Sequence, residues 1–188
     1  MTALTATVAR TEEPVYAIGP EDIIAYHPGN IVHLIVKGPT QPQSRPHVHT
    51  RGRNIIVYNP NRQQQAAMRA VIRQALGIER GTNAFAPNTG LHASIIFHMR
   101  RPSRHFSGGV RRLDRIKENC QGQMPHTGIP DLDNMVKFVS DAMQGILYSD
   151  DSAIYSLTTK KIYDNNDQCD GRTEIKFVAR VIDLTMVE

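Results

Sequence analysis

Apolar residues recur along the chain with two periods, one typical of strands and one typical of helices. Short runs rich in β-branched residues predict strands over residues 31–37, 91–99 and 153–163. A fourth strand is expected over residues 173–182, where apolar and charged residues alternate as they do in a strand buried on one face. A shorter run over residues 55–58 predicts a further strand.

Two segments place apolar residues three and four apart, which is the spacing of a helix with one buried face. The first begins near Asn59-Pro60, a capping side chain followed by the proline that suits a first helical position, and it ends at Gly77. The second has Gly145 near its end and is the clearest element of the chain. Its apolar positions are Leu132, Met135, Val136, Val139, Ala142, Met143 and Ile146.

The connections complete the expected architecture. A polar turn over residues 164–171 predicts that the last two strands form a hairpin, and the Pro-, Gly- and Arg-rich residues 38–54 predict a loop. Residues 1–30 carry Pro and Gly at intervals and are expected to be an irregular N-terminal tail. We therefore expect a single α+β domain over residues 31–188, in which two main helices pack on a small mixed β-sheet.

Composition narrows the class of protein. With 188 residues, of which 40% are hydrophobic and 21% charged, the chain suits one folded domain and is too apolar for wholesale disorder. No apolar run approaches the roughly 18 residues that a membrane helix needs, and the first residues lack the apolar stretch of a secretory signal. Cys120 and Cys169 are too few for a disulfide framework. We expect an intracellular, cytoplasmic protein that is neither secreted nor membrane-bound.

The net charge of +4 becomes informative once it is located along the chain. From Arg100 to Lys117, seven basic residues face only Asp114, which gives this segment a net charge of +6. From Asp131 to Asp151, five aspartates face only Lys137, for a net charge of −4. Such a pair of segments is typical of a site that attracts a polyanion and holds a cation, although solvated surface loops are the commoner explanation of charge runs.

The acidic segment contains two aspartates at the start of the second helix. Residues two apart point to different faces of a helix, so Asp131 and Asp133 can serve one cation only if Asp131 precedes the helix. Pro130 favours that arrangement. Asp133, Lys137 and Asp141 then follow one another at a spacing of four along one polar face of the helix.

A second acidic pair, Asp150-Asp151, lies in the loop after the helix, which can bring it back to the first pair. Several carboxylates suit Mg²⁺ or Mn²⁺, and such a metal site beside a basic segment suits phosphodiester hydrolysis. Lys137 is then placed to neutralise transition-state charge or to orient water. The alternative assigns ordinary structural roles: Asp131 as a helix cap, Asp133 as a first-turn acid paired with Lys137, and the second pair as a turn.

The acidic residues and their surroundings resemble the RusA family of Holliday-junction resolvases, the crossover junction endodeoxyribonucleases. The similarity lies in the run Pro-Asp-Leu-Asp-Asn-Met-Val-Lys over residues 130–137, then Asp141-Ala142, Gly145, and Tyr-Ser-Asp-Asp-Ser over 148–152. Lys160-Lys161-Ile162-Tyr163 is similar to a pattern that ends the following strand in the family. Residues 31–77 match only in outline, and residues 1–30 do not match.

The resemblance implies a RusA-like fold and a homodimeric, Mg²⁺-dependent endonuclease, with Mn²⁺ as a substitute metal, that nicks two opposed strands of a four-way DNA junction in recombination and repair. Carried over by position, Asp131, Asp133 and Asp151 would bind the metal, with Asp150 as a possible further ligand, and Lys137 would be the catalytic lysine. The chain departs from the family at Gly128-Ile129, where many relatives have a basic residue. The resemblance also implies a location at the nucleoid.

Phosphate contacts are expected from the basic segment, which Gly108-Gly109 should make flexible in the absence of DNA. The candidates are Arg100, Arg101, Arg104, Arg111, Arg112, Arg115 and Lys117, with Arg45 from the first loop. No Gly-rich phosphate loop is present, so no nucleotide cofactor is expected. Two alternatives remain open on the sequence: a non-catalytic DNA-binding module of the same fold, and a metal nuclease that acts on flaps, forks or RNA.

Overall fold

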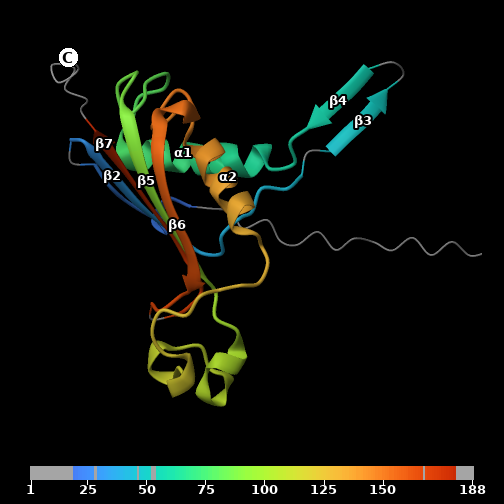
Figure 1. Ribbon diagram of the computed structural model, residues 1–188, viewed down its shortest axis with the longest axis vertical. Coiled ribbons are helices and arrows are strands. Elements are labelled where there is room, and N and C mark those ends of the chain that lie inside the picture. The colour runs from blue at the N-terminus through green and yellow to red at the C-terminus, as the bar shows by residue number, and fades with distance from the viewer. Residues whose placement is uncertain (1–18, 28, 46, 52–53, 167, 181–188) are drawn as a thin grey trace, which may run out of the picture.

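A five-stranded mixed sheet forms the centre of the molecule. The computed structural model describes residues 19–180 except 28, 46, 52–53 and 167. The strands lie in the order β1-β2-β7-β5-β6, and only the β5–β6 pair is parallel (Figure 1). Their bounds are β1 Ile23–Tyr26, β2 Ile31–Lys37, β5 Gly90–Met99, β6 Ile154–Tyr163 and β7 Arg172–Arg180.

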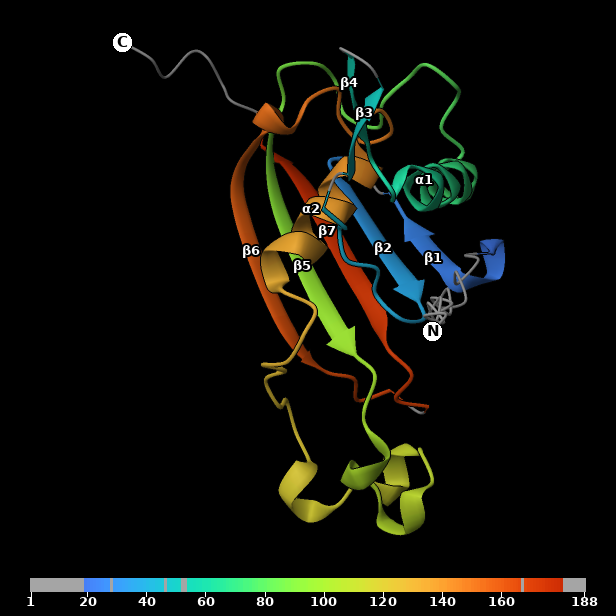
Figure 2. The same cartoon turned by 90° about the vertical axis from the view of Figure 1, so that its right-hand side faces the viewer.

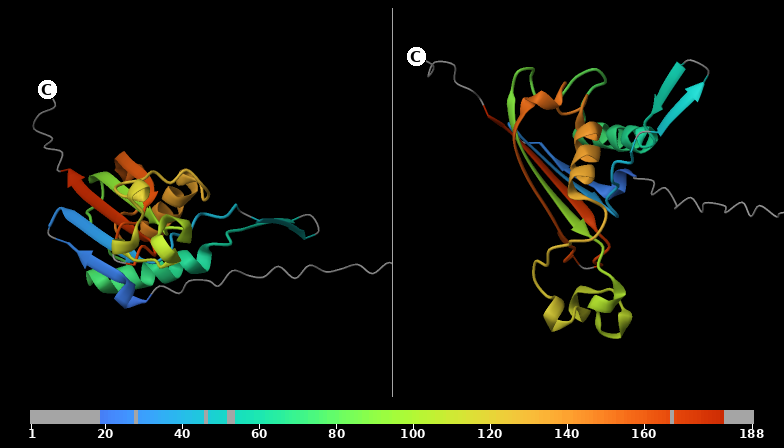
Figure 3. Two further views of the ribbon diagram at one scale, coloured as in Figure 1. Left: turned by 90° about the horizontal axis from the view of Figure 1, so that it is seen from below. Right: turned by 45° about the vertical axis from the view of Figure 1, so that its right-hand side comes forward.

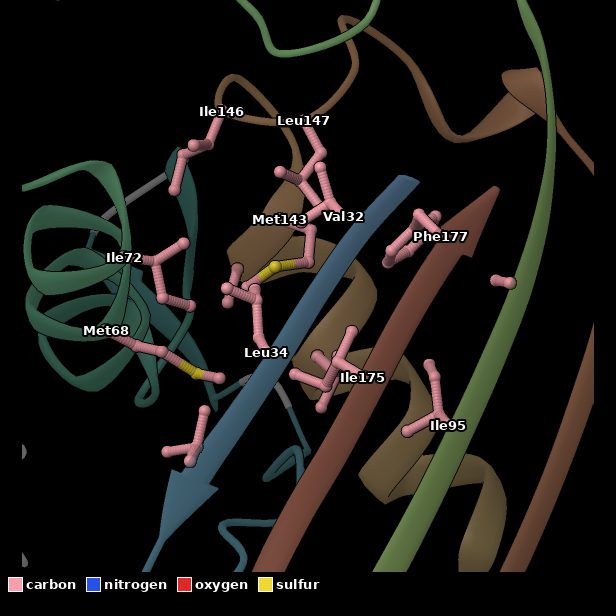
Figure 4. Close-up of a cluster of buried hydrophobic side chains, with 14 of the residues drawn as sticks. Val32, Leu34, Met68, Ile72, Ile95, Met143, Ile146, Leu147, Ile175 and Phe177 are labelled. Carbon is pink, nitrogen blue, oxygen red and sulfur yellow. The ribbon is translucent and has the colours of Figure 1, made fainter. Parts of the chain in front are cut away.

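Two helices, α1 (Arg62–Leu76) and α2 (Leu132–Met143), lie on the same face of this sheet (Figures 2 and 3). The strand register places apolar side chains opposite one another on that face, for example Leu34 beside Ile175 and Ile175 beside Ile95. These meet Met68 and Ile72 from α1 and Met143 from α2 (Figure 4). All these side chains are buried, so the predicted α+β fold with two helices packed on a small sheet is confirmed.

The hairpin predicted for the last two strands is wrong. β6 and β7 are antiparallel in direction, but β5 lies between them and pairs with both. β5 is the most buried strand, with apolar residues Leu91, Ala93, Ile95 and Phe97 fully covered, and a central position gives it a hydrogen-bonded neighbour on each side. The eight-residue connection over 164–171 is long enough to pass the end of β5.

Two short strands lie where irregular chain was expected. Ile23–Tyr26, inside the predicted tail, forms edge strand β1, because the prolines and Gly29 flank the strand instead of interrupting it. Residues 1–18 of that predicted tail lie outside the described residues. In the predicted loop 38–54, β3 (His47–Arg51) pairs with β4 (Asn54–Tyr58), and this two-stranded ribbon projects away from the main sheet (Figures 1 and 3).

Residues 100–124, hereafter the basic lobe, form a projection beyond the ends of β5 and β6 (Figure 1). Four short 3-10 helices run through it, at Ser103–His105, Ser107–Gly109, Leu113–Arg115 and Glu118–Cys120. The predicted flexibility at Gly108-Gly109 stays a prediction, but the lobe has a polar centre of its own. Arg101 is completely buried and donates hydrogen bonds to the carbonyl oxygens of Asp164 (2.7 Å) and Cys120 (2.8 Å).

Two histidines, His105 in the lobe and His126 just after it, pack against the end of β6. The rings of His105 and His126 pack edge-on against Tyr163, with ring centroids 4.7 and 4.8 Å away. Burial lowers the pKa of both imidazoles below 6.5, and a neighbouring cation, Arg101 or Lys161 respectively, lowers it further. The folded protein therefore favours the neutral rings.

We expect the protein to lose stability as the pH falls below 6.5. The unfolded chain takes up protons at these imidazoles near pH 6.5, whereas the folded chain does so only at lower pH, so protonation favours unfolding. Urea denaturation at pH 7.5, 6.5 and 5.5 should show the free energy of unfolding decreasing. The loss should be smaller in a His105→Gln/His126→Gln variant, and an equal loss in that variant would contradict the assignment.

Candidate active site on helix α2

An open groove of about 740 Å³ runs between the outer side of α2 and strand β6. Helix α2 contributes the polar row that begins at Asp133, which the sequence predicts along one helical face. Strand β6 contributes Leu157 and Thr159 from the side that faces the helices. The lining residues are Leu132, Asp133, Val136, Lys137, Ser140, Asp141, Asp151, Leu157 and Thr159. Asp133 and Lys137 from α2 and Asp151 from the segment after this helix thus face one cavity.

Asp131 occupies the position immediately before α2. Its backbone is extended, with φ −70° and ψ 143°, and the helix begins at Leu132, as the argument for a shared cation requires. Its side chain makes no capping hydrogen bond, while its carbonyl oxygen accepts the first helical bond from the Met135 amide at 3.2 Å. The capping alternative therefore does not describe Asp131.

The two aspartates after α2 have different surroundings. Asp150 caps the short helix Asp151–Ala153, since its Oδ1 accepts a hydrogen bond from the Ser152 amide at 3.0 Å, and the bonds to Ser152 lower the pKa of Asp150. Asp151 lines the groove instead. The structure thus gives Asp150 a local structural role and leaves Asp151 as the member of the pair that faces the candidate site.

Lys137 is exposed on the groove side of α2. Within the described part of the chain, no ion pair joins it to Asp133 or Asp141, although both lie one helical turn away. The alternative in which Lys137 serves as a helix-surface partner of Asp133 is therefore not supported by a contact. A lysine without an acidic partner leaves its ammonium available to bind an anionic ligand.

Asp141, at the far end of the row, is held by α1. Gln65 Nε2 donates to its Oδ2 at 3.3 Å, and Arg69 Nη2 donates to its backbone oxygen at 2.7 Å. The buried Tyr148 lies close by and donates to the Ser140 carbonyl oxygen at 3.0 Å. Burial raises the pKa of Tyr148, and the charges of Asp151 and Asp141 raise it further, so the phenol stays protonated.

Sequence reasoning missed part of this groove. Asp141 belongs to the row of Asp133 and Lys137 that the sequence indicates, but it was not among the predicted site residues. Ser140 and Thr159 also line the groove, but an isolated hydroxyl residue on a helix or a strand has no distinguishing pattern.

The chemistry of the groove suits a hard divalent cation, although its acids are not gathered into a complete ligand set. Among residues 19–180, apart from the few not described, no three His, Cys, Asp or Glu side chains lie close enough to hold one metal ion. Mg²⁺ is commonly bound by one or two carboxylates, with water and substrate phosphates as the remaining ligands. Asp133 and Asp151 supply carboxylate oxygens, which are the donors that this mode of Mg²⁺ binding uses.

The structure divides the basic residues predicted to contact phosphate. The prediction that Arg101 contacts phosphate is wrong, because its guanidinium is buried inside the basic lobe and is unavailable to DNA. Arg111 is half-buried, with Nε donating to the Arg101 carbonyl oxygen at 3.1 Å, and Arg100 is exposed but pairs with Asp170 at 3.2 Å. Four others are exposed on the lobe, and one lies before β3: Arg104, Arg112, Arg115, Lys117 and Arg45.

The described residues include no helix with the length and hydropathy needed to cross a membrane. A comparison with curated proteins found no match. The family model for endodeoxyribonuclease RusA matches residues 37–177, well over half of the chain, and this range includes α1, the basic lobe, α2 and the whole groove. The chain therefore belongs to the RusA family of endodeoxyribonucleases, which resolve Holliday junctions.

Proposed function

We propose that this protein is a Mg²⁺-dependent endonuclease that cuts four-way DNA junctions, with the reaction at the groove on α2. The observation that carries the proposal is the placement of Asp133, Lys137 and Asp151 on one groove, in a chain of a junction-resolving nuclease family. Within the described residues, no ion pair joins Asp133, Lys137 or Asp151 to another side chain. Mn²⁺ should substitute for Mg²⁺.

In the proposed reaction, each side chain has a distinct task. Asp133 and Asp151, with Asp131 from the position just before α2, would hold the cation, which when bound would supply activation of water and stabilisation of charge on the attacked phosphate. Lys137 projects its ammonium from the same helical face as Asp133 and stabilises negative charge that develops on the phosphate. Tyr148, protonated and buried, supports the backbone of Ser140 beneath the groove.

A junction is resolved by two symmetric nicks, and the groove on α2 supplies one candidate active site per chain. We therefore propose that two copies act together as a homodimer, each cutting one of the opposed strands. The proposed biological setting is DNA recombination and repair at the nucleoid.

The test is a substrate panel of four-way junction, fork, flap, linear duplex and single strand, incubated with Mg²⁺ or Mn²⁺. Preferential paired nicking of the four-way junction supports the proposal. Cleavage of forks or flaps in its place would assign the same groove to a different branched substrate. Binding of the junction without nicking in either metal would identify a DNA-binding module of this fold.

The exposed cations of the basic lobe should govern the salt dependence of junction binding. Each phosphate contact contributes about 0.9 to the slope of log K against log salt concentration. Replacing Arg112 and Lys117 with glutamine should therefore reduce that slope by about 1–2, measured by fluorescence anisotropy from 50 to 200 mM salt. Arg80→Gln, which changes an exposed arginine outside the lobe, is the control, and an equal effect from it would contradict a specific role for the lobe.

A further inference from the structure

Lys161 contacts the segment that leads into the candidate site. Its Nζ donates hydrogen bonds to the carbonyl oxygens of Gly128 (2.5 Å) and Pro130 (2.6 Å). Pro130 is the residue immediately before Asp131. A single half-buried ammonium on β6 therefore bridges two carbonyl groups of the chain just before the first predicted metal ligand.

The strand register places Lys161 in line with the groove. Thr159 and Lys161 pair with the buried core residues Ile95 and Phe97, so both face the helices. Leu157 and Thr159 line the groove, and Lys161 is the next residue in this row towards the beginning of α2. Its charge thus lies beside the segment that leads into α2.

The neighbouring backbone is fixed by other means up to residue 126. The His126 amide donates to the Lys161 carbonyl oxygen at 3.0 Å, and the Tyr163 amide donates to the Met124 carbonyl oxygen at 2.9 Å, so residues 124–126 pair with the end of β6. For residues 128–130, the hydrogen bonds to described residues come from the Lys161 ammonium.

We propose that Lys161 is a positioning residue for the active site: its ammonium fixes residues 128–130 and thereby sets where the Asp131 carboxylate lies relative to Asp133. The inference rests on the proposed function for its catalytic consequence, but its structural part stands on the two hydrogen bonds alone. The proposal also gives a positive charge a role beside Gly128-Ile129, two uncharged residues that precede the Pro130-Asp131 pair. Groups that orient metal ligands typically affect metal affinity or activity by 10–100-fold.

The test compares Lys161→Met with Lys160→Met. Lys160 is the adjacent residue on the opposite face of β6, and its Nζ contacts only the side chain of Gln123, at 3.4 Å, among the described residues. We expect Lys161→Met to weaken Mn²⁺ binding, followed by titration calorimetry, by 10–100-fold. The value of kcat for junction nicking should fall similarly, with the metal-free junction Kd unchanged. Lys160→Met should match the wild type in metal binding and kcat.

A second measurement does not depend on cleavage. The Met135 amide bonds to the Asp131 carbonyl oxygen, so its hydrogen exchange reports how well the start of α2 is held. Exchange there should accelerate in Lys161→Met but not in Lys160→Met, and Lys161→Arg, which retains donors, should restore slow exchange and much of kcat. Equal exchange and equal Mn²⁺ affinity in the two methionine variants would overturn the inference. Failure of the wild type to nick junctions, with this exchange difference intact, would reject the proposed function alone.

Discussion

Replacing Asp133 with asparagine is expected to reduce Mg²⁺-dependent nicking of a four-way junction by about 10³-fold, or about 4 kcal/mol of activation free energy. The amide has nearly the same shape as the carboxylate, so the fold and groove should persist, but the negative charge that binds a cation is lost. Junction affinity measured without metal should be unchanged or higher, because one negative charge near the DNA phosphates is removed. Single-turnover kinetics with a labelled junction measures the first effect, and anisotropy measures the second.

The matched control for this change is Asp170→Asn. Asp170 is also partly exposed, but it lies beside Arg100 at a cavity separate from the groove on α2. Its replacement should leave nicking within about twofold of the wild type, since surface ion pairs contribute little. A fully active Asp133→Asn protein would place the reaction elsewhere, and loss of activity in both variants would point to a general effect on folding.

Replacing Arg101 with alanine is expected to lower the free energy of unfolding by about 3–5 kcal/mol. The guanidinium is completely buried and bonds to carbonyl oxygens of Asp164, Cys120 and Gly122, with Asn165 as a further partner. Each acceptor left buried without a partner costs about 1–3 kcal/mol, and the removed side chain leaves a cavity. For a domain of this size, a loss of this kind lowers Tm by roughly 10 °C, which calorimetry can measure.

Arg104→Ala separates this structural role from a role in DNA binding. Arg104 is three residues away on the same lobe and is exposed, so its loss should leave Tm unchanged while weakening junction binding. Arg101→Ala, in contrast, should change junction binding only as far as the lobe unfolds. A stable Arg101→Ala protein with weak junction binding would return Arg101 to the set of phosphate contacts.

The sequence was sufficient for elements whose side chains follow one clear period. The strand over residues 31–37 has the bounds expected from its apolar run. The first helix ends at Gly77, whose φ of 64° is the left-handed conformation that glycine adopts readily. Periodicity carries no information on strand order, however, and consecutive strands joined by a turn are usually neighbours. That expectation failed for β6 and β7, because the burial of β5 decided the order of the sheet.

For the candidate site, the sequence predicted which residues share a helical side but not which charged residues are buried. The spacing of four between Asp133 and Lys137 identifies their shared side of the helix, since backbone geometry alone determines it. Burial of a charged residue has no such local signature. Arg101 and Arg104 look equivalent in a basic run, and only tertiary contacts with Asp164 and Cys120 make Arg101 a core residue.

The position of β5 between β6 and β7 has a consequence for the order in which the protein is made and folds. β6 pairs with a strand about sixty residues earlier, from Leu91 opposite Ile154 onwards, so this contact forms only after the basic lobe and α2 have been synthesised. Non-local pairing of this kind is slow, because the loop must close before its contacts form. Asp151 precedes β6 directly, and its approach to Asp133 depends on that pairing. We therefore expect that, if the groove is the active site, a nascent or partly folded chain lacks its assembled set of carboxylates.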